Sequence, residues 1–584
     1  MSLKPEHRAL LVDVAGHYAK KWAEFQADPF TWLWDAARTL NKDALPGQPR
    51  ELAPFPDLPY IRTAWSLYFS EKYLLEDKSR QLMFTWLANA GLAYEAQFLP
   101  NITLGYQNTT TAIAARKVED CFLYILRNQP LEVMMPWVEG RGQDAHPPDD
   151  WVQEVARGFD LNPNPTRRPP PGKPETFGSD AYEFARLLCH TYTVSRGTEG
   201  IEDITLHPHE AMPMPVGCSS TLLVIPGGSN PVDKWRSETF YRAMHDEVWF
   251  YQRAQEAVNS AKQTIGKTGK QLLVTTAFIG YDDDGYPKEM AEGESETDER
   301  LEAYNSTGVW ARRNKLGYTH LRVHYTADPY KRRPEWRAEN VRTRNDYREL
   351  EISYDVPDGD PFYSSFSEAL QLVQVRRLDE SARLLLGQDG GRNPATVVSE
   401  LNDEGRVIVT KEITSENMGV KAHGRKVVNW LDAHYPSWRN SHTLWCDPSM
   451  WQKSESSDES AAAQLMTLGF NCRQGIQDPD VRFDAVQELC IPTPITDTYE
   501  RHAQYGFRPK LVIDAHAAPV LTLGLKGACD IDKGSALAGM NRKTKNMYSH
   551  VCEALEYLAT GLPRVSSRAV KPFKSHQPKR RRTA

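Results

Sequence analysis

The sequence predicts an α/β protein with two halves, each built on a largely parallel sheet. Short apolar runs typical of buried strands alternate with helical patterns along the chain. At 584 residues the chain is also too long for one hydrophobic core, so more than one domain is expected. The strand candidates are residues 222–226, 271–278, 383–389, 406–412, 443–447 and 510–514, and the helix candidates are residues 181–193, 248–264, 419–433, 459–468 and 549–560.

Changes in composition predict where the domains begin and end. A proline-rich stretch at 141–178 predicts a surface insertion in the first α/β domain. A stretch of mixed proline, glycine, aromatic and charged residues predicts the linker between the halves. The expected parts are an N-terminal helical region at 1–50, a first α/β domain at 51–350, a linker at 351–380, a second α/β domain at 381–565 and a basic, disordered tail at 566–584.

Composition narrows the class of protein. Charged residues make up 25% and hydrophobic residues 40%, as in soluble globular proteins. No run of 18 apolar residues occurs, so we expect no transmembrane helix and no membrane partner. The 8 cysteines include no CxxC pair, which disfavours a zinc site or a disulfide framework and suits a reducing cytoplasm. Because the net charge is −7, nucleic acid would have to contact local basic patches. Residues 331–348 and the tail are candidates, with a solvated charged surface as the alternative for each.

Residues 74–87, LLEDKSRQLMFTWL, join two apolar stretches by a short polar turn. A phosphate-binding loop has this layout, but it normally reads GxxxxGK[ST] so that backbone N–H groups, a lysine and a hydroxyl surround the phosphates. Aligning Thr85 with the hydroxyl puts Met83 in a glycine slot and leaves Lys78 at the other end of the turn. From there its long side chain still reaches phosphate as a point charge. A strand–turn–helix without a ligand is the alternative.

Two downstream features favour the nucleotide interpretation. Asp246 and Glu247 follow a partly apolar run that Arg242 and His245 interrupt. Such an acidic pair can hold Mg²⁺ with its first member and orient the attacking water with its second, although most acidic pairs simply lie on a surface. The strand candidate QLLVTTAF then places two threonine hydroxyls, at 275 and 276, where they can sense a γ-phosphate.

This ordered set, K-SRQ-xxx-TW followed by DE and LLVTTA, resembles the ATPase half of the large terminase subunit of tailed bacteriophages. The resemblance implies a P-loop NTPase fold of the ASCE type. It also implies that Asp246 holds Mg²⁺ and that Glu247 is the catalytic carboxylate. Met83 departs from the glycine usual in the family, which puts the tightness of the turn in question. The implied nucleotide-binding set is Lys78, Ser79, Arg80, Gln81, Thr85 and Asp246, with Thr275 and Thr276 as the coupling motif.

The second half offers acids at the ends of separate elements. Asp389 ends the apolar run RLLLGQD, Asp447 follows TLWC, and Glu553 lies in a late helix with His550 and Tyr557 on the same face. Carboxylates that converge from different elements are the ligands two Mg²⁺ ions need around a scissile phosphate. Taken singly, each acid is also compatible with a turn or a surface position.

Here too the chain resembles the large terminase subunit, which implies an RNase H-like nuclease with Asp389, Asp447 and Glu553 as catalytic metal ligands. Glu553 departs from a frequent aspartate and lengthens the side chain. Glu412 and Asp514 are rival ligands that rank lower because they fall outside the family's metal positions, and residues 481–489 fit its arginine-bearing helix. The matching positions are Gly387, Asp389, Asn393 to Ala395, Asp447, Pro448, Lys545, Asn546, Ser549, His550, Ala554, Leu555 and Tyr557.

The resemblance implies a DNA-packaging motor whose ATPase drives double-stranded DNA into a procapsid and whose nuclease cuts the concatemer. It implies ATP and Mg²⁺ as cofactors, with Mn²⁺ as an alternative at the nuclease site. The implied partners are DNA, a portal protein, a small terminase subunit and further copies of the chain in a ring of about five. The implied location is the host cytoplasm, with transient binding to the portal. One alternative is a helicase–nuclease of DNA repair, although no further helicase motif occurs between 300 and 380. The other is a catalytically inactive DNA-binding relative, which Met83 and Glu553 keep open.

Overall fold

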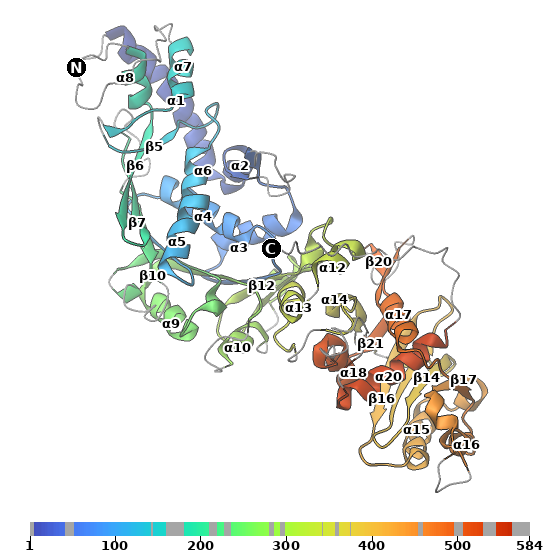
Figure 1. The fold of residues 1–584 in the computed structure, drawn as a ribbon. Coiled ribbons are helices and arrows are strands. Elements are labelled where there is room, and N and C mark those ends of the chain that lie inside the picture. The colour runs from blue at the N-terminus through green and yellow to red at the C-terminus, as the bar shows by residue number, and fades with distance from the viewer. Residues whose placement is uncertain are drawn as a thin grey trace, which may run out of the picture. The chain divides into compact units, whose positions relative to one another are not determined.

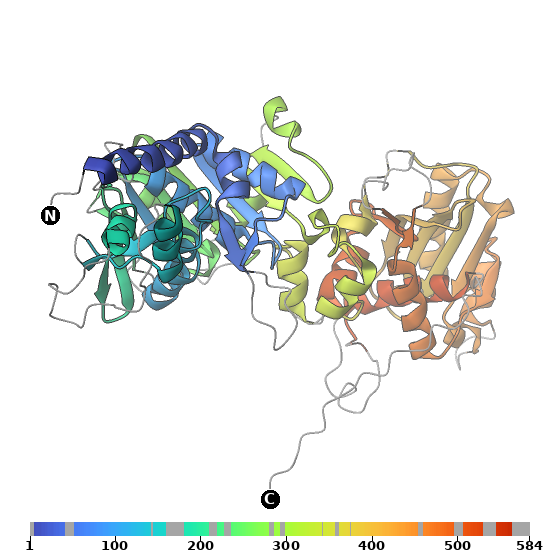
Figure 2. The ribbon, with the colours of Figure 1, turned by 90° about the horizontal axis from the view of Figure 1, so that it is seen from above.

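The computed structural model forms two compact units along the chain. The first unit comprises Met1–Val341 and Asn345–Asp355, and the second comprises Arg342–Arg344 and Val356–Ala584. Within each unit, a twisted sheet is covered by helices (Figure 1, Figure 2). The structure describes residues 5–40, 52–141, 144–158, 180–209, 219–226, 235–236, 238–278, 285–292, 298–341, 343–356, 361–373, 375, 377–453, 459–495, 506–529, 543 and 545–562.

The first unit contains a ten-stranded sheet in the order β11-β12-β3-β10-β9-β4-β8-β7-β6-β5. The strands from β12 to β8 in this order run parallel, and β11 and β7 join antiparallel. Strand β10 lies between β3 and β9, as the ASCE type of P-loop fold requires, so the predicted fold class of this half is confirmed. The strands are β3 (Tyr73–Lys78), β4 (Thr103–Gln107), β5 (Trp137–Glu139), β6 (His190–Gly197), β7 (Gly200–Leu206), β8 (Thr221–Ile225), β9 (Phe240–Asp246), β10 (Ile265–Thr275), β11 (Val309–Arg313) and β12 (Thr319–Val323), with β1 (Arg38–Leu40) and β2 (Leu52–Pro54) in a separate pair.

Helix α4 lies buried along nearly its whole length, so its polar side chains need partners. Glu95 of α4 pairs with Arg242 of β9, whose guanidinium also lies over the Tyr68 ring. This explains how β9 accommodates a buried arginine that interrupts its apolar run. The helices are α1 (Pro5–Ala27), α2 (Pro29–Asp35), α3 (Pro59–Ser70), α4 (Phe84–Phe98), α5 (Thr111–Lys117), η1 (Val118–Leu123), α6 (Tyr124–Arg127), α7 (Asp149–Gly158), α8 (Asp180–Leu187), η5 (Val248–Phe250), α9 (Ala254–Thr264), α10 (Tyr286–Glu292), α11 (Glu299–Glu302), η6 (Tyr325–Ala327), α12 (Pro334–Asn340) and α13 (Arg344–Glu351).

The second unit contains a seven-stranded sheet in the order β13-β21-β16-β15-β14-β17-β18. Strands β14, β15 and β16 form an antiparallel meander, and β17 and β18 continue parallel to β14. This is the RNase H-like order, so the predicted fold class of this half is also confirmed. The elements are α14 (Glu368–Gln371), β13 (Leu372–Val373), β14 (Arg383–Asp389), β15 (Ala395–Leu401), β16 (Val407–Thr414), α15 (Val420–His434), η7 (Trp438–Asn440), β17 (His442–Cys446), η8 (Pro448–Trp451), α16 (Ala461–Met466), β18 (Cys472–Gln474), α17 (Pro479–Cys490), β19 (Thr493–Pro494), β20 (Phe507–Arg508), β21 (Leu511–Asp514), α18 (Pro519–Leu523), η10 (Gly524–Ala528) and α20 (Met547–Thr560).

The alternation of side chains along β14 fixes which helix faces which residue. Leu384 and Leu386 pack in one core with residues of α15 and α16. Gly387 faces α20 instead, and a Cβ there would lie 1.8 Å from the Ala554 carbonyl oxygen. Glycine therefore lets α20 pack directly on β14. Asp389, two residues on, lies on this same face of the strand.

The structure confirms the six predicted strands and corrects two predicted helices. The helix expected over 181–193 ends at Leu187, and β6 begins at His190, because the β-branched sequence that follows suits a strand. The helix expected over 248–264 begins only at Ala254, because Arg253 adopts a left-handed conformation. No helix in the described part of the chain is both long and apolar enough to cross a membrane. The predicted tail at 566–584 and most of the proline-rich insertion fall outside the described residues.

Candidate functional sites

The first candidate site lies where parallel strands of the first unit end. Strands β3, β9 and β10 run parallel and end at Lys78, Asp246 and Thr275, so these residues meet at one edge of the sheet. The turn that follows β3 leads directly into α4. Gln81 and Met83 in this turn have φ values of 65° and 63°, the left-handed conformation that glycine would otherwise supply. The turn therefore adopts a tight form without a glycine.

The start of the turn is held by residues from the end of the first unit. The Ser79 hydroxyl donates to the Leu350 carbonyl at 2.6 Å and accepts from the Tyr325 N–H at 2.8 Å. Arg80 donates to Glu349 at 2.6 Å, and Lys331 donates to the Gln81 carbonyl. Ser79 and Arg80 were both predicted to bind nucleotide. Their side chains instead form hydrogen bonds within the protein. Lys331 comes from the predicted basic patch.

Four of the predicted residues converge. The Lys78 ammonium, only 8% exposed, lies 3.1 Å from Glu247 Oε1. The Thr85 hydroxyl donates to Asp246 Oδ1 at 3.2 Å. Lys78 and Thr85 thus come from opposite ends of the turn, and each contacts one member of the acidic pair. The structure brings together the lysine, the hydroxyl and the acidic pair that sequence reasoning selected.

Asp246 has two further partners that the sequence analysis missed. The Tyr106 hydroxyl donates to Asp246 Oδ2 at 2.9 Å, and the Asn108 amide donates to the same oxygen at 3.1 Å. Both residues lie at the end of β4, beside β9. Burial, with Glu247 next to it, raises the pKa of Asp246 to about 6. A nearby cation stabilises the ionised form of such a buried carboxylate. The site is therefore suited to a phosphate ligand that carries a bound metal ion.

The predicted coupling residues reach the same place. The Thr276 hydroxyl lies 3.4 Å from Glu247 Oε2 and donates to it. The Thr275 hydroxyl donates to the Thr276 carbonyl at 3.0 Å. Glu247 therefore contacts both Lys78 and the end of β10, and it adopts a left-handed backbone conformation with φ of 56°.

The backbone at Met83 leads to a direct test. A left-handed backbone conformation costs a non-glycine residue about 1–2 kcal/mol of folding free energy. Glycine recovers only part of this cost, because it also makes the unfolded chain more flexible and so stabilises the unfolded state. Met83→Gly is therefore expected to have a free energy of unfolding ~1 kcal/mol higher than that of Met83→Ala, measured in urea, because the turn is already left-handed without nucleotide. Equal unfolding midpoints in urea for the two variants would contradict a left-handed Met83.

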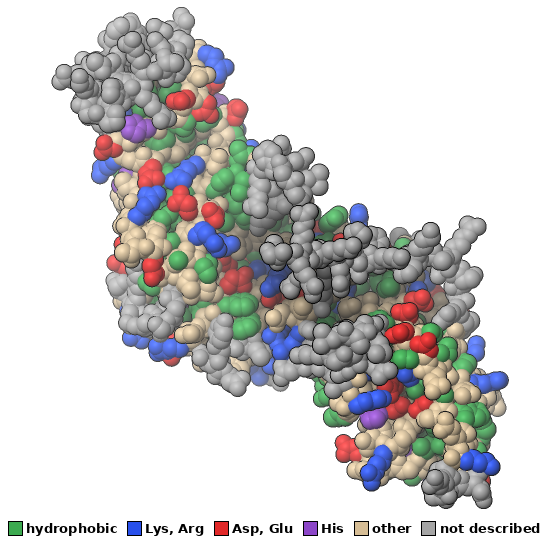
Figure 3. All heavy atoms as spheres, viewed as in Figure 1, with side chains coloured by type: hydrophobic (Ala, Val, Ile, Leu, Met, Phe, Trp, Pro, Cys, Tyr) green, Lys and Arg blue, Asp and Glu red, His purple; other side chains and the backbone are tan. Residues whose placement is uncertain are grey.

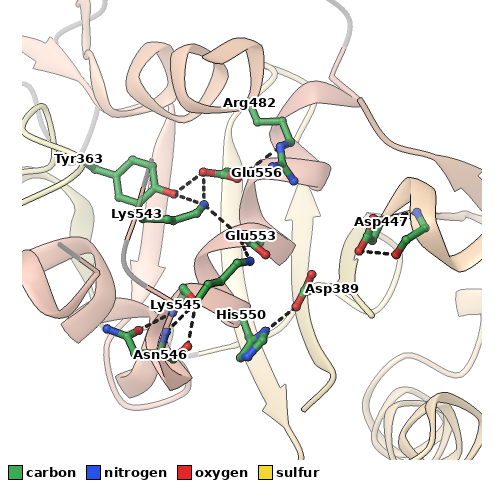
Figure 4. A network of polar contacts seen from close by, with 12 residues as sticks. Tyr363, Asp389, Asp447, Arg482, Lys543, Lys545, Asn546, His550, Glu553 and Glu556 are labelled. Atoms are coloured by element: carbon green, nitrogen blue, oxygen red, sulfur yellow. Dashed lines mark hydrogen bonds and ion pairs between the residues drawn. The ribbon is translucent and has the colours of Figure 1, made fainter. Parts of the chain in front are cut away.

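The second candidate site lies between β14 and α20 (Figure 4). His550 Nδ1 lies 2.8 Å from Asp389 Oδ2, and Glu553 lies one helical turn further along α20. One ligand atom from each of Asp389, His550 and Glu553 falls within 4.8 Å of the other two. In Figure 3, acidic side chains gather over α17 and α20, with basic side chains and a histidine beside them. Two carboxylates and an imidazole form a donor set that can hold a divalent cation such as Mn²⁺ or Mg²⁺.

The two carboxylates of this site have different electrostatic surroundings. Burial, with Glu553 nearby, raises the pKa of Asp389 to about 6. Burial opposes ionisation of Glu553 as well, but Lys543 and Lys545 hold its pKa below the usual value. The hydrogen bond to Asp389 raises the pKa of His550. Sequence reasoning placed His550 on the same helical face as Glu553 but did not assign it as a ligand.

Asp447 lies on the neighbouring strand end, outside this group of three. Its N–H donates to the Gln388 carbonyl at 3.0 Å, which puts it beside Asp389 across the sheet. Its carboxylate accepts from the Ser449 N–H at 2.9 Å and the Ser449 hydroxyl at 2.8 Å, and so caps the helix η8. Asp447 thus adds a second acid at this end of the sheet but does not belong to the cluster of Asp389, His550 and Glu553.

The two rival ligands have structural partners instead. Glu412 accepts from the Val520 and Leu521 N–H groups at 2.8 and 2.7 Å, and so holds the start of α18. Asp514 accepts from the His516 N–H at 3.0 Å in the turn that follows β21. Both carboxylates thus hold backbone N–H groups of the turns beside them.

No family model and no curated protein matches the sequence. Solved structures similar to this chain include large terminases of bacteriophages. The large terminase of the thermophilic bacteriophage D6E is 11% identical to this chain, with a TM-score of 0.29. The alignment covers 86% of this chain and 98% of that terminase. The large terminase of bacteriophage HK97 is 11% identical over 88% of this chain and 95% of its own, with a TM-score of 0.23. A yeast mitochondrial Holliday junction resolvase is 12% identical over 31% of this chain and 80% of its own, with a TM-score of 0.16.

Proposed function

We propose that this chain is the large subunit of a viral DNA-packaging motor, with an ATPase in its first unit and a DNA-cutting site in its second. The observation that carries the proposal is the convergence of Lys78 and Thr85 on Asp246 and Glu247 at one edge of a parallel sheet. A cation, a hydroxyl and two carboxylates around a tight turn before a helix are the groups that phosphoryl transfer from ATP needs.

Each residue of the first site has a separate task. Lys78 contacts the phosphates, while Thr85 and Asp246 hold Mg²⁺, which neutralises charge on the phosphates when bound. Glu247 orients the attacking water and accepts its proton. Without nucleotide, Lys78 is paired with Glu247. Phosphate draws Lys78 away, so Glu247 becomes free to act only when its substrate is present.

The second site acts on a phosphodiester. Asp389, His550 and Glu553 hold a divalent cation, and Asp447 extends the site on the neighbouring strand. A bound cation there supplies charge for the scissile phosphate and activates water. These residues lie at the carboxyl ends of β14 and β17 and on α20, so they meet a DNA backbone from one side. Contact through phosphates makes DNA binding salt-sensitive and weakly dependent on sequence.

The biological setting rests on the sequence resemblance to large terminase subunits. We infer double-stranded DNA, a portal protein and a small terminase subunit as partners, and a ring of about five copies on the procapsid as the working assembly. The working location is the host cytoplasm. The predicted domain boundaries, 51–350 for the ATPase and 381–565 for the nuclease, belong to the same proposal.

Removal of divalent metal tests both activities together. The full-length chain is expected to release phosphate from ATP and to nick supercoiled plasmid in Mg²⁺, and EDTA is expected to stop both because each site requires a cation. Phosphate release and gel mobility of the plasmid measure the two. If neither activity appears in Mg²⁺ or Mn²⁺ although ATP and DNA still bind, the chain is an inactive relative.

A displacement assay separates a packaging motor from a helicase. A translocase on duplex DNA is expected to strip a third strand from a triplex with ATP while leaving the duplex paired. A helicase would instead separate the two strands of the duplex. Strand separation without triplex displacement would therefore contradict the proposal and favour the helicase–nuclease alternative.

A further inference from the structure

Glu553 faces two lysines in addition to the candidate metal site (Figure 4). The Lys545 ammonium lies 2.5 Å from Glu553 Oε1, and the Lys543 ammonium lies 3.8 Å from the same oxygen. Both lysines precede α20, the helix that carries Glu553. A carboxylate that is positioned to bind a divalent cation therefore already holds a cation of the protein itself.

The two lysines differ in how firmly they are held. Lys543 is 7% exposed, and its ammonium contacts Glu556 and the Tyr363 hydroxyl as well. These contacts give it a fixed structural place. The Lys545 side chain is 66% exposed, and its ammonium contacts Glu553. Within the part of the chain that the structure describes, Lys545 can therefore leave Glu553 without exposing a buried charge or breaking a second contact.

A bound divalent cation and the Lys545 ammonium compete for Glu553. Mg²⁺ and Mn²⁺ need direct contact with carboxylate oxygens, and Lys545 occupies one of these oxygens. Two positive groups at such short range also repel each other. Once displaced, an exposed lysine with a flexible four-carbon chain remains close to the site. The nearest anion it would then meet is a phosphate of bound DNA.

We propose that Lys545 is an exchangeable cation, which occupies Glu553 in the absence of metal and moves to a DNA phosphate when metal binds. The proposal rests on the proposed metal-dependent nuclease. Lys545 acts as a positioning residue: it keeps Glu553 in place before metal arrives, and it holds the DNA backbone afterwards. Metal binding and DNA binding are thereby linked through one side chain. As a consequence, the protein binds metal more weakly when DNA is absent.

Calorimetry with Mn²⁺ alone tests the first half of this exchange on the full-length protein. Lys545→Met is expected to bind Mn²⁺ about threefold to tenfold more tightly than the unaltered chain, because a competing charge of modest strength is removed. Lys545→Arg keeps the charge and is expected to bind Mn²⁺ like the unaltered chain. The matched control is Lys510→Met, because Lys510 precedes β21, a strand separated from β14 by β16 and β15 in the same sheet.

Fluorescence anisotropy of a labelled duplex tests the second half. With Ca²⁺ in place of Mg²⁺ to prevent cutting, Lys545→Met is expected to bind DNA more weakly. Its plot of log affinity against log salt is expected to be shallower by about 0.9, the loss of one phosphate contact. The Lys510→Met control is expected to retain the slope. A lysine that only stabilised α20 would leave both the Mn²⁺ affinity and this slope unchanged.

The outcomes separate this proposal from the one on which it rests. If the unaltered chain binds Mn²⁺ but Lys545→Met binds it no more tightly, the exchange is wrong and the metal site stands. An unchanged salt slope would likewise overturn the transfer to DNA. If the unaltered chain binds no Mn²⁺ at all, the metal centre itself is wrong, and the exchange falls with it.

Discussion

Glu247→Gln is expected to slow ATP hydrolysis by about 10²–10⁴-fold, the usual contribution of a general base. The amide keeps the size and shape of the side chain but cannot accept a proton from water. Nucleotide binding is expected to persist, since Lys78, Thr85 and Asp246 are unchanged. Lys78 also loses its ion pair, so affinity for ATP is expected to rise rather than fall. Phosphate release and binding of a fluorescent ATP analogue measure the two effects.

Two controls make this expectation specific. Glu299→Gln changes an exposed acid of the first unit, in α11, and is expected to leave ATP turnover unchanged. Plasmid nicking by Glu247→Gln should also match the unaltered chain, because the residues proposed to cut DNA lie in the other unit. Near-normal ATP turnover in Glu247→Gln would remove Glu247 from the mechanism. Loss of both activities with a cooperative unfolding transition retained would contradict the assignment of two independent sites.

The strands of both sheets were predictable where they were strongly apolar. Strand β14 (Arg383–Asp389) and residues 271–275 of β10 are buried inside their sheets, and their apolar runs mark them clearly. Strand β12, next to β3, was missed because its sequence THLRV mixes polar and apolar residues. Its histidine and threonine are buried through partners such as Asp77 and Glu71, which a linear pattern does not reveal.

The candidate nucleotide site was predictable because its residues occur in a fixed order along the chain. Lys78 and Thr85 flank one turn, and the acidic pair follows a strand that ends at the same edge. Tyr106 and Asn108 were missed because a single polar residue after a strand has no sequence signature. Their contact with Asp246 depends on β4 lying beside β9, which only the sheet order shows.

The candidate metal centre was predictable in part. The spacing of His550 and Glu553 puts both on one face of α20, but the spacing does not show what that face contacts. The contact with Asp389 depends on the close packing of α20 against β14 at Gly387. Asp447 follows β17, the strand that pairs with β14, but its carboxylate caps η8, and a cap and a metal ligand look alike in sequence.

Asp389→Asn is expected to reduce plasmid cutting by at least about 100-fold. Mutating a residue that only hydrogen-bonds to a metal ligand typically lowers metal affinity or activity by about 10–100-fold, and loss of a direct ligand is expected to cost at least as much. The amide retains the shape of the side chain but provides one neutral oxygen where two charged oxygens were available. Mn²⁺ affinity measured by calorimetry is expected to fall together with cutting. ATP hydrolysis in the first unit is expected to be unchanged.

The matched control is Asp403→Asn, because Asp403 is an exposed acid in the turn between β15 and β16 of the same sheet. It is expected to cut DNA normally. The comparison also weighs Asp389 against Asp447, since Asp447 already caps a helix and Asp389 faces His550 and Glu553. Asp447→Asn is therefore expected to weaken Mn²⁺ binding less than Asp389→Asn does. If Asp389→Asn bound Mn²⁺ normally while Asp447→Asn did not, the metal would be centred on β17, and His550 would be an orienting group rather than a ligand.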